Sequence, residues 1–356
     1  SGPEWVFALN AGLAMVAGFI IMRWRREHKE SPLGRERLTS AMRVGLQYVW
    51  QSSRMRAILL RISIFFLHST ALMALLPLVA KALPGGQAGT FTALLASMGV
   101  GAIVAALTMP RIRGLLPLQE RVFAGTALQA VAAVVVAYAP NIYVAVPAMV
   151  IAGAAWITVA NSLTVAAQMA LPDWVRARGM SIYQMALMGS TALGAALWGQ
   201  VATLGGIHAS LVISAATAVA AMGLAQRFVQ DRGSDEDLSP KPGVLKVPMM
   251  PAPPTQGRIR VTIEYRIDPG RADEFRQVMQ ETRTSRLQQG ALDWKLLHDL
   301  HDPARWIEQI TDENWTEHLR RFDRVTGADV KLRDRRLAFH VGEDPPVVTR
   351  FRVEGD

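Results

Sequence analysis

The sequence lacks several features that would each point to a different kind of protein. It contains no cysteine among its 356 residues, which excludes disulfide bonds, thiolate metal sites and cysteine nucleophiles. It begins at Ser1 rather than at an initiator methionine, and no signal peptide with a charged n-region and a cleavage site precedes its first apolar run. Its long apolar runs contain no aspartate or glutamate after Glu4.

Those apolar runs are the dominant feature of the chain. A helix that crosses a bilayer needs roughly 20 mainly apolar residues. Seven segments reach that length, and soluble cores do not repeat in this way. They are residues 5–22, 57–80, 88–110, 122–139, 143–166, 179–202 and 207–226. The sequence therefore predicts a mainly helical, multi-pass membrane bundle of seven spans.

The positive charge between these spans predicts their orientation. Basic residues concentrate in alternate connections, which are cytoplasmic under the positive-inside rule. These residues are Arg23, Arg25, Arg26, Lys29, Arg35, Arg37, Arg43, Arg54, Arg56, Arg111, Arg113, Arg121, Arg176 and Arg178. Seven spans with a cytoplasmic C-terminus place Ser1 outside. We therefore expect a fragment, and five further helices upstream would make twelve.

The net charge of +9 belongs to residues 1–257, because residues 258–356 hold 18 basic against 19 acidic side chains. We interpret this excess as a topology signal and as attraction to anionic lipid, and we expect no nucleic-acid partner.

Residues 35–51 predict an amphipathic helix, in which Leu38, Met42, Leu46 and Val49 recur at helical spacing and Tyr48 and Trp50 resemble membrane-interface anchors. That helix lies either on the cytoplasmic leaflet or against other protein.

Polar side chains inside the spans are the candidates for substrate contact. Thr158, Asn161 and Gln168 share one face of the fifth span at steps of three and four residues. Side chains on other spans are expected to join them around a central cavity near the bilayer midplane: Asn10, His68, Gln184 and Gln200. The alternative is that the amides only bond helix to helix and that His68 is satisfied by a neighbouring helix.

A second candidate site lies at the cytoplasmic start of the sixth span. Asp173 can accept amide hydrogen bonds there and pair with Arg176 and Arg178. An ion pair that forms in one conformation and breaks in another would act as a cytoplasmic gate. The alternative is that the two arginines only set the topology.

Close helix packing is predicted by small residues. Ser97, Gly101 and Ala105 stand four apart on one helix face, so a neighbouring backbone can approach there.

After the last span, residues 230–257 contain six prolines and many polar residues, which predicts an extended linker. Residues 258–356 then have the order strand, helix, strand, strand, helix, strand. Alternation predicts a first strand through Ile259 and Tyr265, and Thr311 or Asp312 is the expected cap of the second helix. This order is typical of a ferredoxin-like α+β domain.

Several strings carry a resemblance to a known family. They are Trp5 to Ala11, Ala74 to Ala80, Gly153 to Thr158 and, most specifically, Leu171 to Gly179 followed by Tyr183 and Gln184. Residues 3–229 thereby resemble the sixth to twelfth helices of a major facilitator superfamily transporter, in the branch of the enterobactin exporter and the transmembrane secretion effectors. The resemblance implies a secondary active exporter of a siderophore or drug, working by alternating access in the cytoplasmic (inner) membrane.

The tail resembles a second family. Gly290 to Trp294, Asp302 to Arg305 and Trp315 to His318 are similar to the antibiotic-biosynthesis monooxygenases, which are dimeric α+β barrels. Asn314 and His318, four apart on one helix face, are a weak catalytic signal. The alternative function is therefore a membrane-anchored monooxygenase-like or ligand-binding domain.

The resulting prediction has five parts: residues 1–23, one membrane helix; 24–56, a basic connection with an amphipathic helix; 57–229, a six-helix bundle; 230–257, the linker; and 258–356, a cytosolic domain. We expect a transporter rather than an enzyme, without a cofactor or a bound metal. The expected partners are a small-molecule substrate, the lipid bilayer, the five missing helices and a second copy bound through residues 258–356.

Overall fold

The computed structural model describes residues 3–24, 33–34, 36–84, 88–229, 236–241, 243–244, 247–248, 254 and 256–354. The chain forms two compact units, Ser1–Arg37 and Leu38–Asp356, and each is described by itself. Parts of the predicted basic connection, including Arg25, Arg26, Lys29 and Arg35, lie outside the described residues, as does most of the predicted linker 230–257.

The first unit contains one helix, α1 (Pro3–Arg23). It is apolar on all sides, and none of its spanning window is buried. A helix that is hydrophobic all round is expected in lipid or in the core of a larger assembly. Asn10, a predicted substrate contact, is exposed on this helix.

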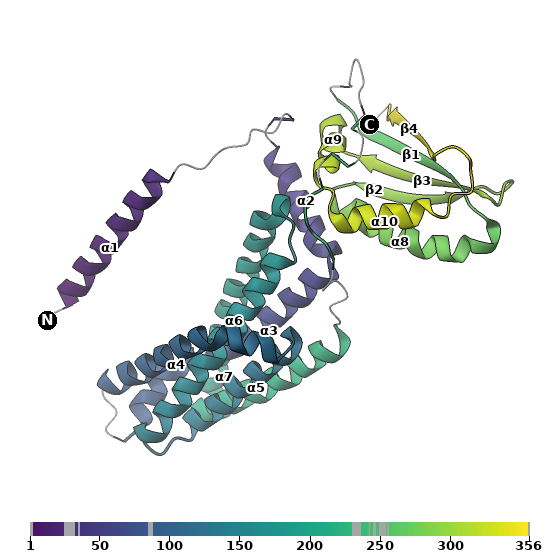
Figure 1. Cartoon of the computed structure of the whole chain (residues 1–356). Helices are drawn as coiled ribbons and strands as arrows, with labels where there is room; N and C mark the ends of the chain where they lie inside the picture. Colours follow the sequence, from purple (N-terminus) through teal and green to yellow (C-terminus); the bar gives the residue numbers. More distant parts are fainter. Residues whose placement is uncertain are drawn as a thin grey trace. The chain divides into compact units, whose positions relative to one another are not determined.

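The second unit begins with six helices, shown in Figure 1: α2 (Leu38–Gln51), α3 (Ser53–Ala82), α4 (Ala88–Leu115), α5 (Leu118–Ala137), α6 (Ile142–Met169) and α7 (Asp173–Phe228). Within the described residues, α1 and α3 to α7 are long and apolar enough to cross a membrane, which makes six candidate helices rather than seven.

The difference in number comes from α7, which is 56 residues long and changes direction at Gly206. Gly206 has φ 84° and ψ 164°, a conformation that side chains with a Cβ rarely adopt. The Ser210 hydroxyl donates to the Trp198 carbonyl at 2.8 Å, although twelve residues of straight helix would separate them by about 18 Å. The chain therefore turns back, and the predicted segments 179–202 and 207–226 lie on either side of the turn.

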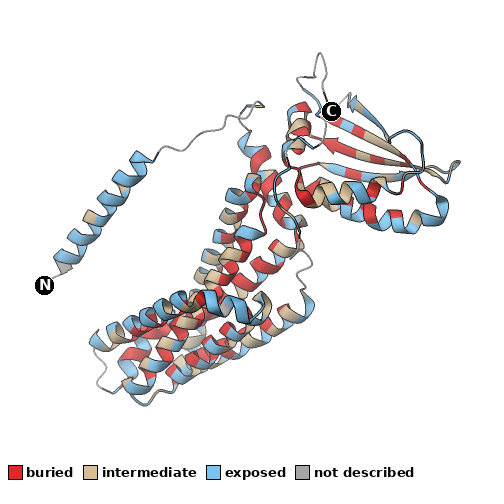
Figure 2. Ribbon diagram, in the orientation of Figure 1, coloured by how far each residue is buried: buried red, intermediate tan, exposed pale blue. Residues whose placement is uncertain are grey.

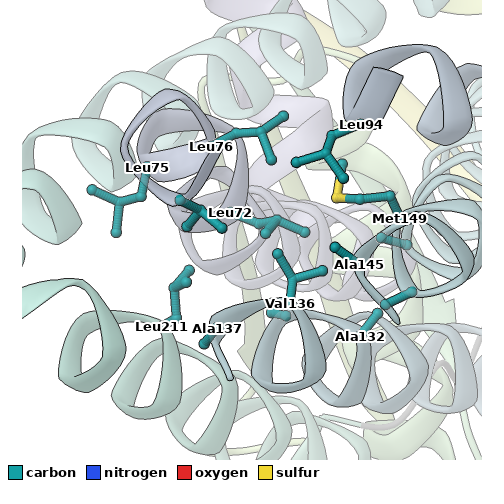
Figure 3. Packing of buried hydrophobic residues seen from close by; sticks show 14 of the residues in the cluster. Leu72, Leu75, Leu76, Leu94, Ala132, Val136, Ala137, Ala145, Met149 and Leu211 are labelled. Carbon is teal, nitrogen blue, oxygen red and sulfur yellow. The ribbon is translucent and has the colours of Figure 1, made fainter. Parts of the chain in front are cut away.

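Buried apolar side chains hold these helices together. In one cluster Leu72 and Leu76 of α3 pack with Val136 of α5, Met149 of α6 and Leu94 of α4 (Figure 3). Figure 2 shows the buried residues on the inward faces of the helices, while the outward faces are exposed. Because those outward faces are also apolar, they suit a lipid environment.

Glycines let neighbouring backbones approach. A Cβ on Gly101 of α4 would lie 1.9 Å from the Val150 carbonyl oxygen of α6, and a Cβ on Gly153 would lie 1.9 Å from the Met98 oxygen. These two contacts are reciprocal, so α4 and α6 pack through paired glycines. The predicted close approach at Gly101 is confirmed.

Helix α2 packs against protein on one face and leaves its other face exposed. Val44, Tyr48 and Val49 are buried, whereas Met42 and Leu46 are exposed. Leu38 and Trp50 continue the exposed apolar stripe at steps of four residues. The prediction of Tyr48 as an interface anchor is wrong, because its ring is inside the protein and its hydroxyl donates to the Ala170 carbonyl at 3.2 Å.

The C-terminal part contains a small four-stranded antiparallel sheet. Its elements are β1 (Ile259–Arg266), a 3₁₀ turn η1 (Pro269–Arg271), α8 (Ala272–Gln288), β2 (Asp293–His298), β3 (Arg305–Asp312), α9 (Trp315–Asp323), α10 (Gly327–Leu337) and β4 (Val347–Arg352). The strand order is β2-β3-β1-β4. Helices α8 and α10 lie side by side against one face of this sheet (Figure 1).

Two local details differ from the prediction. Helix α9 is capped by Asn314, whose side chain accepts from the Glu317 amide, and not by Thr311 or Asp312. Helix α10 was missed, although Thr326 and Asp329 form a capping box at its start.

Part of the predicted linker is attached to this domain. The backbone of Glu236–Lys241 runs beside the start of α10, where the Lys241 amide donates to Val325 and the Gly327 amide donates to Ser239, both at 3.0 Å. The described part of the linker is therefore docked rather than free.

Candidate functional site

The polar face of α6 is only half covered by protein. Thr158 and Asn161 are both of intermediate exposure, and Gln168 near the end of the helix is exposed. Asn161 accepts a hydrogen bond from the Arg113 guanidinium of α4 at 3.3 Å. The structure thus adds Arg113, which the sequence analysis assigned only to topology, to the predicted polar face.

Helix α7 meets this face one turn further on. The hydroxyl groups of Thr164 on α6 and Tyr183 on α7 are 3.0 Å apart. Gln184 follows Tyr183 directly and is exposed, and Gln200 is exposed near the turn at Gly206. Gln184 lies eleven residues after the start of α7, about 16 Å along the helix axis.

An exposed amide on a membrane helix carries a physical constraint. Lipid tails offer no hydrogen bond to Gln184, and an unsatisfied polar group in hydrocarbon costs several kcal/mol, about 4 or more on a water-to-cyclohexane scale. A face that exposes such groups therefore needs water, a ligand or another polar helix beside it.

His68 lies in a different place. Its Nδ1 is 2.6 Å from the Ile64 carbonyl oxygen one turn earlier, and its ring lies 5.6 Å from the Trp198 ring. It lines a cavity of about 20 Å³ between α3, α5 and α7, and among the described residues no side chain of α6 reaches that cavity. The structure therefore separates His68 from Thr158, Asn161 and Gln168.

The polar groups around His68 were missed by sequence reasoning. Gln129 of α5 is buried, and neither atom of its amide has a hydrogen-bond partner among the described residues. Ser69 of α3 is in the same situation. Gln129 is the only amide in the span 122–139, which is the signal that could have identified it.

The structure brings together two of the three residues predicted to form a gate. Asp173 and Arg176 form an ion pair of 2.7 Å, one turn apart on an exposed surface. Arg176 also donates to the Leu171 carbonyl at 3.3 Å, which anchors the start of α7. Arg178 is directed to another element, because its side chain packs against Gly45 of α2.

Trp174, in the same string, joins three parts of the molecule. Its ring meets Tyr48 of α2 edge to face at 5.7 Å. The guanidinium of Arg324, at the end of α9, lies 5.2 Å from the centre of the Trp174 ring, within the range of a cation–π contact. The most specific string of the membrane part therefore contacts the C-terminal domain.

Helix α2 supplies the rest of this contact. Arg43 pairs with Glu313 at 2.9 Å, and the Ser40 hydroxyl donates to the same carboxylate at 3.0 Å. Gln47 donates to the Ala291 carbonyl at 2.7 Å. Three polar side chains at consecutive turns of α2 thus bind the start of β2 and the loop before α9.

Inside the C-terminal domain, Glu308 is fully buried and accepts hydrogen bonds from Tyr265, Arg286 and Trp294 at 3.0, 2.9 and 3.1 Å. Burial alone would raise the pKa of Glu308, but the charges of Arg286 and Arg336 and these hydrogen bonds outweigh it and hold the pKa at about 2. Glu308 is therefore ionised at neutral pH.

A second buried group surrounds Asp312, which accepts from Arg321 at 2.9 Å and from His318 Nδ1 at 2.7 Å. Arg350 donates to His318 Nε2 at 3.2 Å, so Nε2 carries no proton and His318 is neutral. Burial lowers the pKa of His318, which agrees with this assignment. Asn314 caps α9, so the Asn314 and His318 pair has a structural explanation.

The fold and the site define a multi-pass membrane protein with a small α+β domain. The family model of the transmembrane secretion effectors matches residues 1–354, and the chain belongs to that family of major facilitator superfamily transport proteins. A search of curated proteins finds no match for the chain. Among the described residues, no group of three or more histidine, aspartate or glutamate side chains could hold a metal ion.

Proposed function

We propose that the protein exports a small molecule, such as a siderophore or a drug, across the cytoplasmic membrane by alternating access. The observation that carries this proposal is the half-exposed polar face of α6 and α7, where Gln184 is exposed and Asn161 is half exposed beside Arg113 of α4. Such a face suits a water-filled substrate pathway near the bilayer midplane.

Arg113 gives this pathway a charged cytoplasmic end. It lies in the last turn of α4, and its bond to Asn161 brings a cation to the polar face of α6. A cation at the entrance favours substrates that carry negative charge or oxygen acceptors, such as catecholates. The ion pair of Asp173 and Arg176 lies at the cytoplasmic start of α7, where we expect it to act as the gate.

We further propose that α2 lies on the cytoplasmic leaflet. Its exposed stripe of Leu38, Met42, Leu46 and Trp50 faces away from the bundle and from the C-terminal domain. Lipid is the environment that such a stripe fits, because the opposite face of α2 is already buried.

For the C-terminal domain we propose the ferredoxin-like fold and a cytosolic location, with dimer formation through the uncovered face of its sheet. The order β2-β3-β1-β4 with two helical crossovers supports this fold. Leu297 and Phe351 are about half exposed on strands β2 and β4, so the uncovered face offers apolar area to a second copy.

The export proposal is tested with 2,3-dihydroxybenzoate, an anionic catechol, as the probe, in inverted vesicles that contain the full protein. Asn161→Leu and Gln184→Leu should each reduce its energised uptake at least five-fold while insertion stays normal. The matched control is Gln129→Leu, which also removes a membrane amide but lies on α5 beside His68. The proposal is wrong if the α6 and α7 variants transport as well as the control.

A further inference from the structure

A cavity of about 460 Å³ lies within the C-terminal domain. Its floor is the face of the sheet that carries Val261, Ile263 and Tyr265 on β1, and its roof is formed by α8, α9 and α10. Cavities of 300 to 1,000 Å³ with a mainly apolar lining and a few convergent polar groups are typical of small-molecule sites.

The floor is apolar and continuous across three strands. Val261 is paired with Ile310 of β3 on one side, and Ile263 is paired with Val348 of β4 on the other. Because side chains that oppose each other across antiparallel strands point to the same face, these four residues form one apolar surface. This surface can hold the apolar body of a ligand.

The opposite part of the lining is rich in arginine. Five arginines line the cavity, and all of them belong to the helices that form its roof or to β4: Arg286, Arg321, Arg333, Arg336 and Arg350. The carboxylates that balance this charge are fewer, namely Glu308 and Asp312 beneath the lining, Asp329 in it and Asp334 beside Arg333. His318 is neutral, so positive charge remains in excess.

Arg336 shows most clearly that the protein leaves charged groups of this cavity without full hydrogen-bond partners. Its side chain is more than nine-tenths buried, and its nearest carboxylate is Glu308 at 3.9 Å, beyond hydrogen-bond distance. Its Nε has no hydrogen-bond partner among the described residues, and the same holds for Nε of Arg321. A buried guanidinium in this state costs free energy unless an anion is supplied.

The burial of these cations disfavours their charged form. Burial is the largest cause that lowers the pKa of Arg336, and it is also the cause that lowers the pKa of Arg350. Arg350 has no carboxylate partner among the described residues, and its one hydrogen bond goes to neutral His318. Both arginines therefore gain from an anionic ligand.

We propose that this cavity binds an organic acid, with its carboxylate at Arg336 and Arg350 and its apolar body on the Val261, Ile263 and Ile310 surface. The guanidinium group suits a carboxylate because it can donate two parallel hydrogen bonds to it. The inference does not rest on the export function, because every group that it uses lies between residues 261 and 350.

The test uses the full chain in lipid nanodiscs and isothermal titration calorimetry with 2-naphthoate as the probe. The neutral analogue 2-naphthamide has the same apolar body without the charge. Naphthoate should bind, and naphthamide should bind at least ten-fold more weakly, because it leaves the two arginines without an anion.

Two variants remove the proposed contacts. Arg336→Gln should weaken naphthoate binding at least ten-fold, and Arg350→Gln, which is less buried and less apt to disturb folding, should also weaken it. The matched control is Arg335→Gln, one position away, where the side chain points outward and pairs with Glu281 at 2.8 Å.

The proposal is overturned if naphthoate and naphthamide bind equally, if neither binds to the protein, or if Arg335→Gln weakens binding as much as Arg336→Gln. Ile263→Trp, which fills the apolar floor, provides a further check. It should abolish binding of both probes while the thermal unfolding of the domain stays cooperative, and unchanged binding would contradict the proposed position of the apolar body.

Discussion

The close packing of α4 on α6 gives the sharpest prediction about the membrane bundle. In Gly101→Ala the new Cβ would lie 1.9 Å from the Val150 carbonyl oxygen, whereas ordinary van der Waals contact begins at 3.4 Å. The two helices must therefore separate locally by about 1.5 Å. Because the clash is with backbone, no side chain can rotate away to relieve it, and overpacking of this kind costs about 1 to 3 kcal/mol.

Gly99→Ala is the matched control, since it lies on the same helix and its Cβ would meet nothing within 4 Å. Both substitutions gain the same helix propensity, up to about 1 kcal/mol, so that gain cancels in the comparison. Gly101→Ala should then unfold roughly 2 to 12 °C below Gly99→Ala, taking 2 to 4 °C per kcal/mol.

The assay is thermal unfolding of the two variants in the same detergent, followed by tryptophan fluorescence. Equal melting temperatures would refute the reasoning, because they would mean that α4 and α6 do not approach through Gly101. Gly153→Ala supplies an independent repeat, since its Cβ would meet the Met98 oxygen at the same 1.9 Å.

Three further predictions concern helix α2 and the C-terminal domain. The pKa of Glu308 in the folded protein, about 2, lies below the ordinary value of 4.5, so its contribution to stability is complete above pH 4.5 and is lost as the pH falls toward 2. In acid unfolding of the protein, Glu308→Gln should therefore reduce the dependence of stability on pH in this range. A double-mutant cycle of Arg43→Ala and Glu313→Ala should give a coupling of about 0.5 to 1 kcal/mol, because the pair is partly exposed, and zero coupling would argue against the contact of α2 with the domain. Since the chain has no cysteine, Leu46→Cys can carry a single bimane label, which nitroxide-labelled lipid should quench more strongly than a label at Leu300→Cys on the domain surface; equal quenching would remove α2 from the leaflet.

The sequence was sufficient for the features that depend on local patterns. Length and hydropathy predict each membrane helix because a span must satisfy its own backbone hydrogen bonds, and alternation predicts β1 through Ile259 and Tyr265. The start of α9 was misplaced by two or three residues, since Thr311, Asp312 and Asn314 can all cap a helix and β3 extends through Asp312.

Contacts between distant segments were beyond the sequence. The two faces of α2 look alike in a hydropathy pattern, and only the structure shows that Tyr48 points inward while Leu46 points outward. His68 was grouped with Asn161 because both are polar and deep, but helix rotation places His68 beside Gln129 instead. That the candidate site residues line a substrate pathway stays a prediction.

The contact of Arg324 with Trp174 has a consequence for motion. Trp174 lies at the end of a helical segment that runs from Asp173 to Gly206, about 50 Å long. A tilt of that segment by 10° about its centre would move Trp174 by roughly 4 Å, whereas the ring now lies 5.2 Å from the guanidinium and such contacts fade beyond about 6 Å. The C-terminal domain must therefore either travel with α7 when that segment tilts or lose the contact between Arg324 and Trp174.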